Sequence, residues 1–169
     1  MQSNERGQLL IESLVAITII LIAVVGIFSL LSRSLSLTRV ISDQYTGTYL
    51  AAEGLEVVKN IVDTNFIKRC QNWNSGFSSG NYSVSYDSAS LEELRVNPLN
   101  FNPVTGLYSY ESGGQASKFR RDIHIQIIEG GEAMHVESKV QWKTRGAAEF
   151  ESVLEDTFYG WRPQSAECL

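Results

Sequence analysis

Glu12 is the residue whose surroundings most require a chemical explanation. It lies five positions after Gly7 and directly before Ser13–Ser32, a segment without a charged residue. An acidic side chain inside a membrane-length segment is rare and usually functional, and near the helix centre its insertion costs roughly 2.5–3.5 kcal/mol. Two interpretations follow. Glu12 is a first-turn glutamate that the helix dipole favours at headgroup level, or it is a carboxylate that pairs with a positive group.

The other residues that commonly carry chemistry form no catalytic pattern. The sequence contains no G-x-S-x-G, no H-E-x-x-H and no phosphate-binding glycine loop. His124 and His135 are accompanied by no second cluster of histidines, cysteines or carboxylates at metal-ligand spacing, and we expect both to be solvated. We therefore predict that the protein is not an enzyme and holds neither a metal nor a cofactor.

The charge of the chain does not predict a nucleic-acid partner. The net charge is −5, whereas a protein that binds phosphates of nucleic acid needs a basic surface. The short basic cluster Lys118–Arg121 is interpreted as the solvated start of a strand rather than as a DNA contact.

The segment Ser13–Ser32 is long enough to cross a membrane as a helix. About 20 residues span a hydrocarbon core of roughly 30 Å, and the segment contains one glycine, Gly26, and no proline. A cleaved secretory signal fits poorly, because its apolar region is only about 7–15 residues long and ends in a small-residue cleavage site. Arg6 lies on one side of the segment and Arg33 and Arg39 on the other, so the positive-inside rule does not decide its orientation.

The N-terminal residues MQSNERGQLLIES combine a short polar leader, a glycine and a glutamate five positions later, just before the apolar run. This combination resembles the class III signal of type IV pilins and of the related type II secretion and competence pseudopilins. The resemblance implies a leader peptide of residues 1–7. A membrane-embedded aspartyl peptidase would cut after Gly7 and methylate the new N-terminal residue, Gln8. Glu12 would then dock onto the free α-amine of another subunit.

The sequence departs from the usual pattern of this family at three points. Gln8 stands where phenylalanine is usual, the leader carries Glu5 beside Arg6, and the helix-breaking proline of many major pilins is missing. The divergent Gln8 and the missing proline favour a minor subunit.

The resemblance also implies partners and a location. The partners would be the prepilin peptidase/methyltransferase, other pilin subunits that bundle their helices in a filament, an inner-membrane assembly platform and, before assembly, membrane lipid. The chain would be a single-pass protein of the cytoplasmic (inner) membrane with an extracytoplasmic C-terminal head, and would join a surface or periplasmic filament. The expected function is that of a structural subunit, a minor pilin or pseudopilin. The alternative is a monomeric membrane-anchored binding or sensor module, in which the spacing of Gly7 and Glu12 is coincidental.

Beyond the apolar segment the helical pattern continues. Residues 8–32 are predicted to form the membrane-spanning or filament-core half of one helix, and residues 33–66 its amphipathic continuation. Apolar residues recur there at steps of three and four, which is the spacing of one helix face; they are Ala51, Leu55, Val58, Val62 and Phe66, with Val57 and Ile61 beside them. The alternative is two helices that meet near Ser42–Asp43. Gly47 and Gly54 lower the helix propensity locally.

The remainder is predicted to be a head made mainly of strands. The expected fold class is α+β, a long N-terminal helix packed on a small antiparallel sheet, as in the pilin fold. Residues 67–106 are interpreted as a variable loop region, in which a capping-box pattern predicts a short helical turn at Leu91–Arg95. A strand is expected at Leu107–Glu111, within the sheet and C-terminal segment of residues 107–169.

Two segments on either side of Gly130-Gly131 alternate apolar and polar residues, as half-buried strands do. A two-residue Gly-Gly loop predicts a hairpin, and its register places Ile127 opposite Met134, Ile125 opposite Val136 and Phe119 opposite Trp142. On the other face the same register pairs Asp122 with Lys139 and His124 with Glu137.

The last part of the chain is less determined. Phe150, Leu154 and Phe158 fit one face of a strand or of a helix, and their spacing alone does not choose. The order VQWKTRGAAEFESVLEDTFYGWR resembles the last two strands of minor-pilin heads that carry a "modification protein" label. In an extracytoplasmic head, Cys70 and Cys168 would form a disulfide, which would close a loop of about 100 residues; two free thiols are the alternative.

Overall fold

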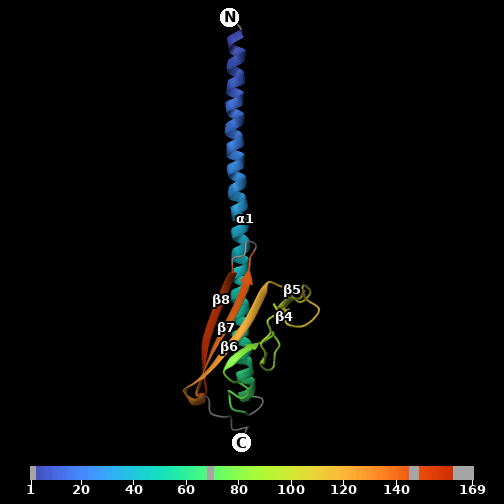
Figure 1. Cartoon of the computed structure of the whole chain (residues 1–169), viewed down its shortest axis with the longest axis vertical. Helices are drawn as coiled ribbons and strands as arrows, with labels where there is room; N and C mark the ends of the chain where they lie inside the picture. Colours follow the sequence, from blue (N-terminus) through green and yellow to red (C-terminus); the bar gives the residue numbers. More distant parts are fainter. Residues whose placement is uncertain (1–2, 68–70, 145–148, 162–169) are drawn as a thin grey trace. The chain divides into compact units, whose positions relative to one another are not determined.

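The computed structural model describes residues 3–67, 71–144 and 149–161 (Figure 1). The chain divides into two compact units, Met1–Ser42 and Asp43–Leu169. One helix, α1 (Ser3–Ile67), contributes to both units. The helix predicted from the periodicity is therefore confirmed, and the alternative of two helices that meet near Ser42–Asp43 is wrong.

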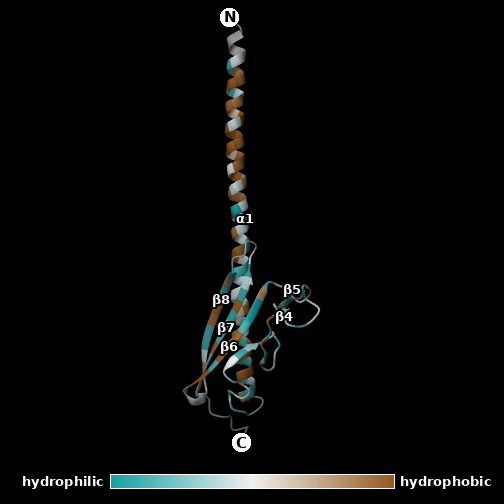
Figure 2. Ribbon diagram, in the orientation of Figure 1, coloured by the Kyte–Doolittle hydropathy of each residue, from teal (hydrophilic) through white to brown (hydrophobic). Residues whose placement is uncertain are grey.

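The first unit contains the apolar part of α1, which is mainly brown in Figure 2. Residues 7–39 of the helix are exposed. The hydroxyls of Ser13 and Thr18 donate to the carbonyls of Leu10 and Leu14, at 3.0 and 2.8 Å, so these polar side chains are satisfied by their own helix. Within the described part of the chain, α1 is the one helix long and apolar enough to cross a membrane. The unit is compatible with a single-pass membrane anchor.

The second unit contains a five-stranded antiparallel sheet with the strand order β2-β1-β6-β7-β8. Its strands are β1 (Gly80–Ser83), β2 (Glu92–Glu93), β6 (Phe119–Ile128), β7 (Ala133–Lys143) and β8 (Glu149–Tyr159). A small second sheet has the order β4-β3-β5, from β3 (Asn100–Phe101), β4 (Tyr108–Ser109) and β5 (Gln115–Ala116). The α+β class predicted from the sequence is confirmed.

The β6–β7 hairpin has the predicted register. Ile127 pairs with Met134, Ile125 with Val136 and Phe119 with Trp142 along an uninterrupted ladder. The strands are joined through a short 3-10 turn, η1 (Glu129–Gly131), in which Gly130 and Gly131 have φ angles of 69° and 104°. Residues with side chains rarely adopt such angles, which explains why two consecutive glycines stand there.

The core of the second unit forms where the α1 segment Asp43–Ile67 packs on one face of the sheet. The predicted apolar faces meet there, and the buried residues include Ala51, Val57, Val58, Ile61, Phe119, Ile123, Ile125, Met134, Val136, Val140 and Trp142. Two helix glycines make the approach close. A Cβ at Gly47 would collide with the Trp142 ring, and one at Gly54 would collide with the Ser138 hydroxyl. The glycines that weaken the helix propensity are required by its packing on the sheet.

The structure corrects two expectations for the head and decides a third that the sequence left open. The turn predicted at Leu91–Arg95 is wrong, because this segment supplies the edge strand β2, which pairs with β1. The strand expected at Leu107–Glu111 is confirmed only over β4. The undecided C-terminal segment is a strand, β8, which pairs with β7 over its whole length, from Glu149 to Tyr159.

Candidate functional site

Gly7 and Gln8, the residues expected at a processing site, lie in the exposed first part of α1. A Cβ placed on Gly7 would meet no atom within 4 Å, whereas the Cβ positions at Gly47 and Gly54 are occupied by sheet side chains. Glycine in a helix costs about 1 kcal/mol relative to alanine. Packing within the described residues therefore explains Gly47 and Gly54 but gives no reason for a glycine at position 7.

Glu12 is exposed and lies among exposed apolar side chains, including Leu9 and Leu14, which are 65% and 67% exposed. The residues one turn away on the helix, such as Gln8 and Val15, carry no positive charge. The described part of the chain offers Glu12 neither an ion pair nor a hydrogen bond. A positive partner for this carboxylate would therefore have to lie outside the described residues.

Arg121 is the polar centre of the head, and its side chain is fully buried. Its guanidinium donates to the Glu53 carboxylate at 2.8 Å and to the Leu50 carbonyl at 3.0 Å, both on α1, and to the Val84 carbonyl at 2.6 Å. The interpretation of the Lys118–Arg121 cluster as solvated is wrong for Arg121. A planar, forked donor reaches three acceptors on two segments at once, so a single buried cation joins the helix, β6 and the loop after β1.

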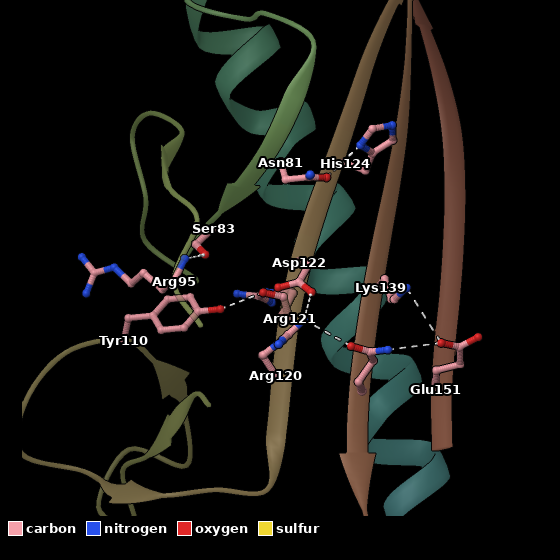
Figure 3. A network of polar contacts seen from close by, with 11 residues as sticks. Asn81, Ser83, Arg95, Tyr110, Arg120, Arg121, Asp122, His124, Lys139 and Glu151 are labelled. Atoms are coloured by element: carbon pink, nitrogen blue, oxygen red, sulfur yellow. Dashed lines mark hydrogen bonds and ion pairs between the residues drawn. The ribbon is translucent and has the colours of Figure 1, made fainter. Parts of the chain in front are cut away.

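Tyr110 contacts the same cluster from the short connection between β4 and β5 (Figure 3). Its hydroxyl donates to the Arg121 carbonyl at 2.8 Å. Burial raises the pKa of the Tyr110 hydroxyl, and the neighbouring Ser83 and the charge of Arg121 offset part of that rise. Tyr110 thus stays a neutral donor that holds the connection against β6.

On the outer face of the sheet, the charged residues lie opposite one another as the register predicts. The side chains of Asp122 and His124, however, contact other residues. Asp122 lies opposite Lys139, yet its carboxylate accepts from Arg120 at 2.6 Å. His124 lies opposite Glu137, yet its ring contacts the Asn81 side chain at 2.8 Å (Figure 3). The described residues contain no group of three or more potential metal ligands.

Cys70 and Cys168 both lie outside the described residues, so their disulfide stays a prediction. The residues that sequence reasoning did not recognise are Arg121, Gly47 and Gly54. A signal for Arg121 was present: it occupies a core-facing position between Phe119 and Ile123, where a solvated side chain does not belong.

A long N-terminal helix, apolar in its first part and packed on an antiparallel sheet in its second, resembles the architecture of pilins. The comparisons with known proteins add no relative: no family model, no curated protein and no solved structure matches the chain.

Proposed function

We propose that this chain is a structural subunit of a type IV pilin-like filament, which is processed after Gly7 and assembles through the first part of α1. The observation that carries the proposal is Glu12, a carboxylate on an exposed apolar helix to which the described residues offer no partner. It lies five residues after Gly7, which has no packing role among those residues. The proposed role is that of a minor pilin or pseudopilin.

The exposed apolar side chains of α1 support this proposal, because such a continuous apolar surface needs to be buried in lipid or against other helices. Leu10, Ile22 and Leu30 are 70%, 68% and 70% exposed, and their neighbours are similar. Burying one such side chain contributes about 1.5–3 kcal/mol. Lipid provides this burial before assembly, and a bundle of helices from other subunits provides it in a filament.

Glu12 makes the transfer of α1 from lipid into a helix bundle specific for one register. Lipid tails are as apolar as the helix, so the hydrophobic effect alone does not draw such helices together in a membrane. A carboxylate in an apolar phase needs a positive partner. Cleavage after Gly7 creates one, the α-amine of Gln8, and an amine of this kind on another subunit would pair with Glu12 only when the helices are in register.

Mass spectrometry of the N-terminus of the protein from its native membrane tests the proposal. We expect a chain that starts at Gln8 and is heavier by one methyl group. A chain that keeps residues 1–7 contradicts the proposal and favours the monomeric anchored module. As a matched pair, Gly7→Val is expected to block processing, because the cleavage site must be small, whereas Gly26→Val in the same helix is expected to leave it intact.

A further inference from the structure

The last strand of the sheet, β8, presents a backbone edge that the rest of the described chain leaves unpaired. β7 pairs with all of β8, from Glu149 to Tyr159, and the described residues place no strand on the other side (Figure 1). Natural proteins protect long edges with charged side chains, above all lysine, and with proline, bulges or short strands. Of these, β8 has only acidic side chains: Glu149, Glu151, Glu155 and Asp156. β8 contains no proline and no lysine, and its ladder with β7 has no bulge.

The direction of the free backbone groups follows from the ladder. The amide of Gly160 donates to the carbonyl of Glu132, one step beyond the last β7–β8 pair. Because amides alternate along an antiparallel strand, the even-numbered residues of β8 face β7 and the odd-numbered ones face outward. The Thr157 amide fits this direction, since it bonds the Asp156 side chain at 2.7 Å instead of β7. The outward set includes Glu151, Val153 and Glu155.

The side chains along this edge define the chemistry of a complementary strand. On the outer face, Glu149, Glu151 and Glu155 already contact Lys143, Lys139 and His135 of β7, at 2.6, 4.0 and 3.4 Å. The three glutamate side chains nevertheless remain more than half exposed. Each carboxylate accepts several hydrogen bonds, so a second row of cations fits on the free side.

The inner side of the edge is mainly apolar, with Ser152 and Asp156 as its polar residues. Phe150, Leu154 and Phe158 are only partly buried there. A hollow of about 210 Å³ lies at the end of β8, lined by aromatic residues that include Phe66, Trp73 and Phe158. Such a recess accepts an apolar side chain.

We propose that the β8 edge docks an extended segment of another protein, which alternates apolar and basic side chains and extends the sheet by one strand. A second copy of β8 is a poorer occupant, because self-pairing would place two acidic strands side by side and would supply no cation to the carboxylates. The proposal does not rest on processing at Gly7 or on pairing of Glu12.

The test uses the full chain in detergent with two synthetic peptides, one alternating lysine and valine, the other glutamate and valine. We expect the lysine peptide to bind and to slow amide exchange in β8, and the glutamate peptide not to bind. Val153→Pro removes an outward amide without removing a bond to β7, and is expected to weaken binding at least about tenfold. Equal binding by Val153→Pro, or no slowing of exchange in β8, overturns the proposal.

A second variant keeps the proposal testable if Val153→Pro perturbs the fold. Reversal of charge, Glu151→Lys with Glu155→Lys, leaves every backbone group in place and is expected to exchange the preference, so that the glutamate peptide binds better. A variant that still prefers the lysine peptide overturns the assignment of the partner's charge. Self-association of the wild-type chain that Val153→Pro abolishes would show a second copy at this edge and would also overturn it.

Discussion

The guanidinium of Arg121, on β6, lies 2.8 Å from the carboxylate of Glu53, on α1, and the Arg121 side chain is fully buried. Glu53 is about one-third exposed, so the ion pair stands at the border of the core. A buried cation that loses its anion becomes a large penalty, whereas an exposed ion pair contributes little. This difference makes Arg121 and Glu53 the pair through which the attachment of the helix to the sheet is best tested.

Glu53→Gln is expected to lower the free energy of unfolding by about 1.5–3 kcal/mol, the typical contribution of a hydrogen bond to a charged group. The measurement is urea unfolding of the full chain in detergent, followed by tryptophan fluorescence. Glu56→Gln is the matched control three residues later on the same helix, where the partner Lys59 is 53% exposed. Its effect should stay within about 0.5 kcal/mol; equal effects of the two variants would contradict a structural role for the buried pair.

Gly54→Ala is expected to destabilise the head, although alanine is the better helix former. The added Cβ would lie 2.9 Å from the Ile123 side chain and closer still to the Ser138 hydroxyl. Overpacking of this kind costs about 1–3 kcal/mol, which exceeds the gain of about 1 kcal/mol in helix propensity.

Two further variants serve as controls for the clash predicted in Gly54→Ala. Gly26→Ala has open space around it and should not lower stability. Combining Gly54→Ala with Ser138→Gly should restore part of the loss, because the two side chains then no longer compete for one position. If the loss of stability in the double variant equals the sum of the losses in the two single variants, the contact with Ser138 is not the cause of the destabilisation.

The raised pKa of Tyr110 predicts how the free energy of unfolding decreases at alkaline pH. Since burial raises the pKa of its hydroxyl in the folded protein, the unfolded chain ionises first, at about pH 10, and binds fewer protons than the folded chain above that pH. The contribution of Tyr110 is therefore complete below about pH 10 and decreases as the pH rises through the folded-state value. Tyr110→Phe should cost about 1 kcal/mol at neutral pH and flatten the alkaline decline. Unfolding curves from pH 7 to 11 would measure both effects, and an unchanged alkaline slope would contradict this account.

Glu12→Gln tests the proposed docking group with the smallest change of shape. Membrane insertion should be unchanged or slightly better, because a neutral side chain enters lipid more easily. Incorporation into filaments should fall by more than about tenfold, since one partner of a desolvated pair is removed. Quantitative immunoblots of sheared filaments and of membranes from the same cells would separate the two steps. Normal incorporation of Glu12→Gln would argue against the docking role, and Glu56→Gln serves as the control for loss of a glutamate.

The residues of the candidate processing and docking site could be predicted from the sequence, because they are close together along the chain. Gly7, Gln8 and Glu12 lie within a few positions of one another on a single helix, so no long-range contact is needed to bring them together. The structure adds a difference between the glycines of α1. Gly47 and Gly54 are required by packing, whereas Gly7 has open space around it within the described residues.

The sequence by itself determined the elements whose periodicity is long or whose turn is specified locally. Those are α1 and the β6–β7 hairpin, in which period-two alternation and two positive-φ glycines leave one register that keeps Ile125 and Trp142 on the core face. Only the tertiary structure decided the pairing of β1 with β2 and β6, since short polar strands depend on distant backbone partners. It also decided that β8 is a strand, because residues spaced by four suit either element until a ladder is available. Arg121 belongs to the same class: its burial becomes favourable only when Glu53 and two carbonyls from separate segments converge on it.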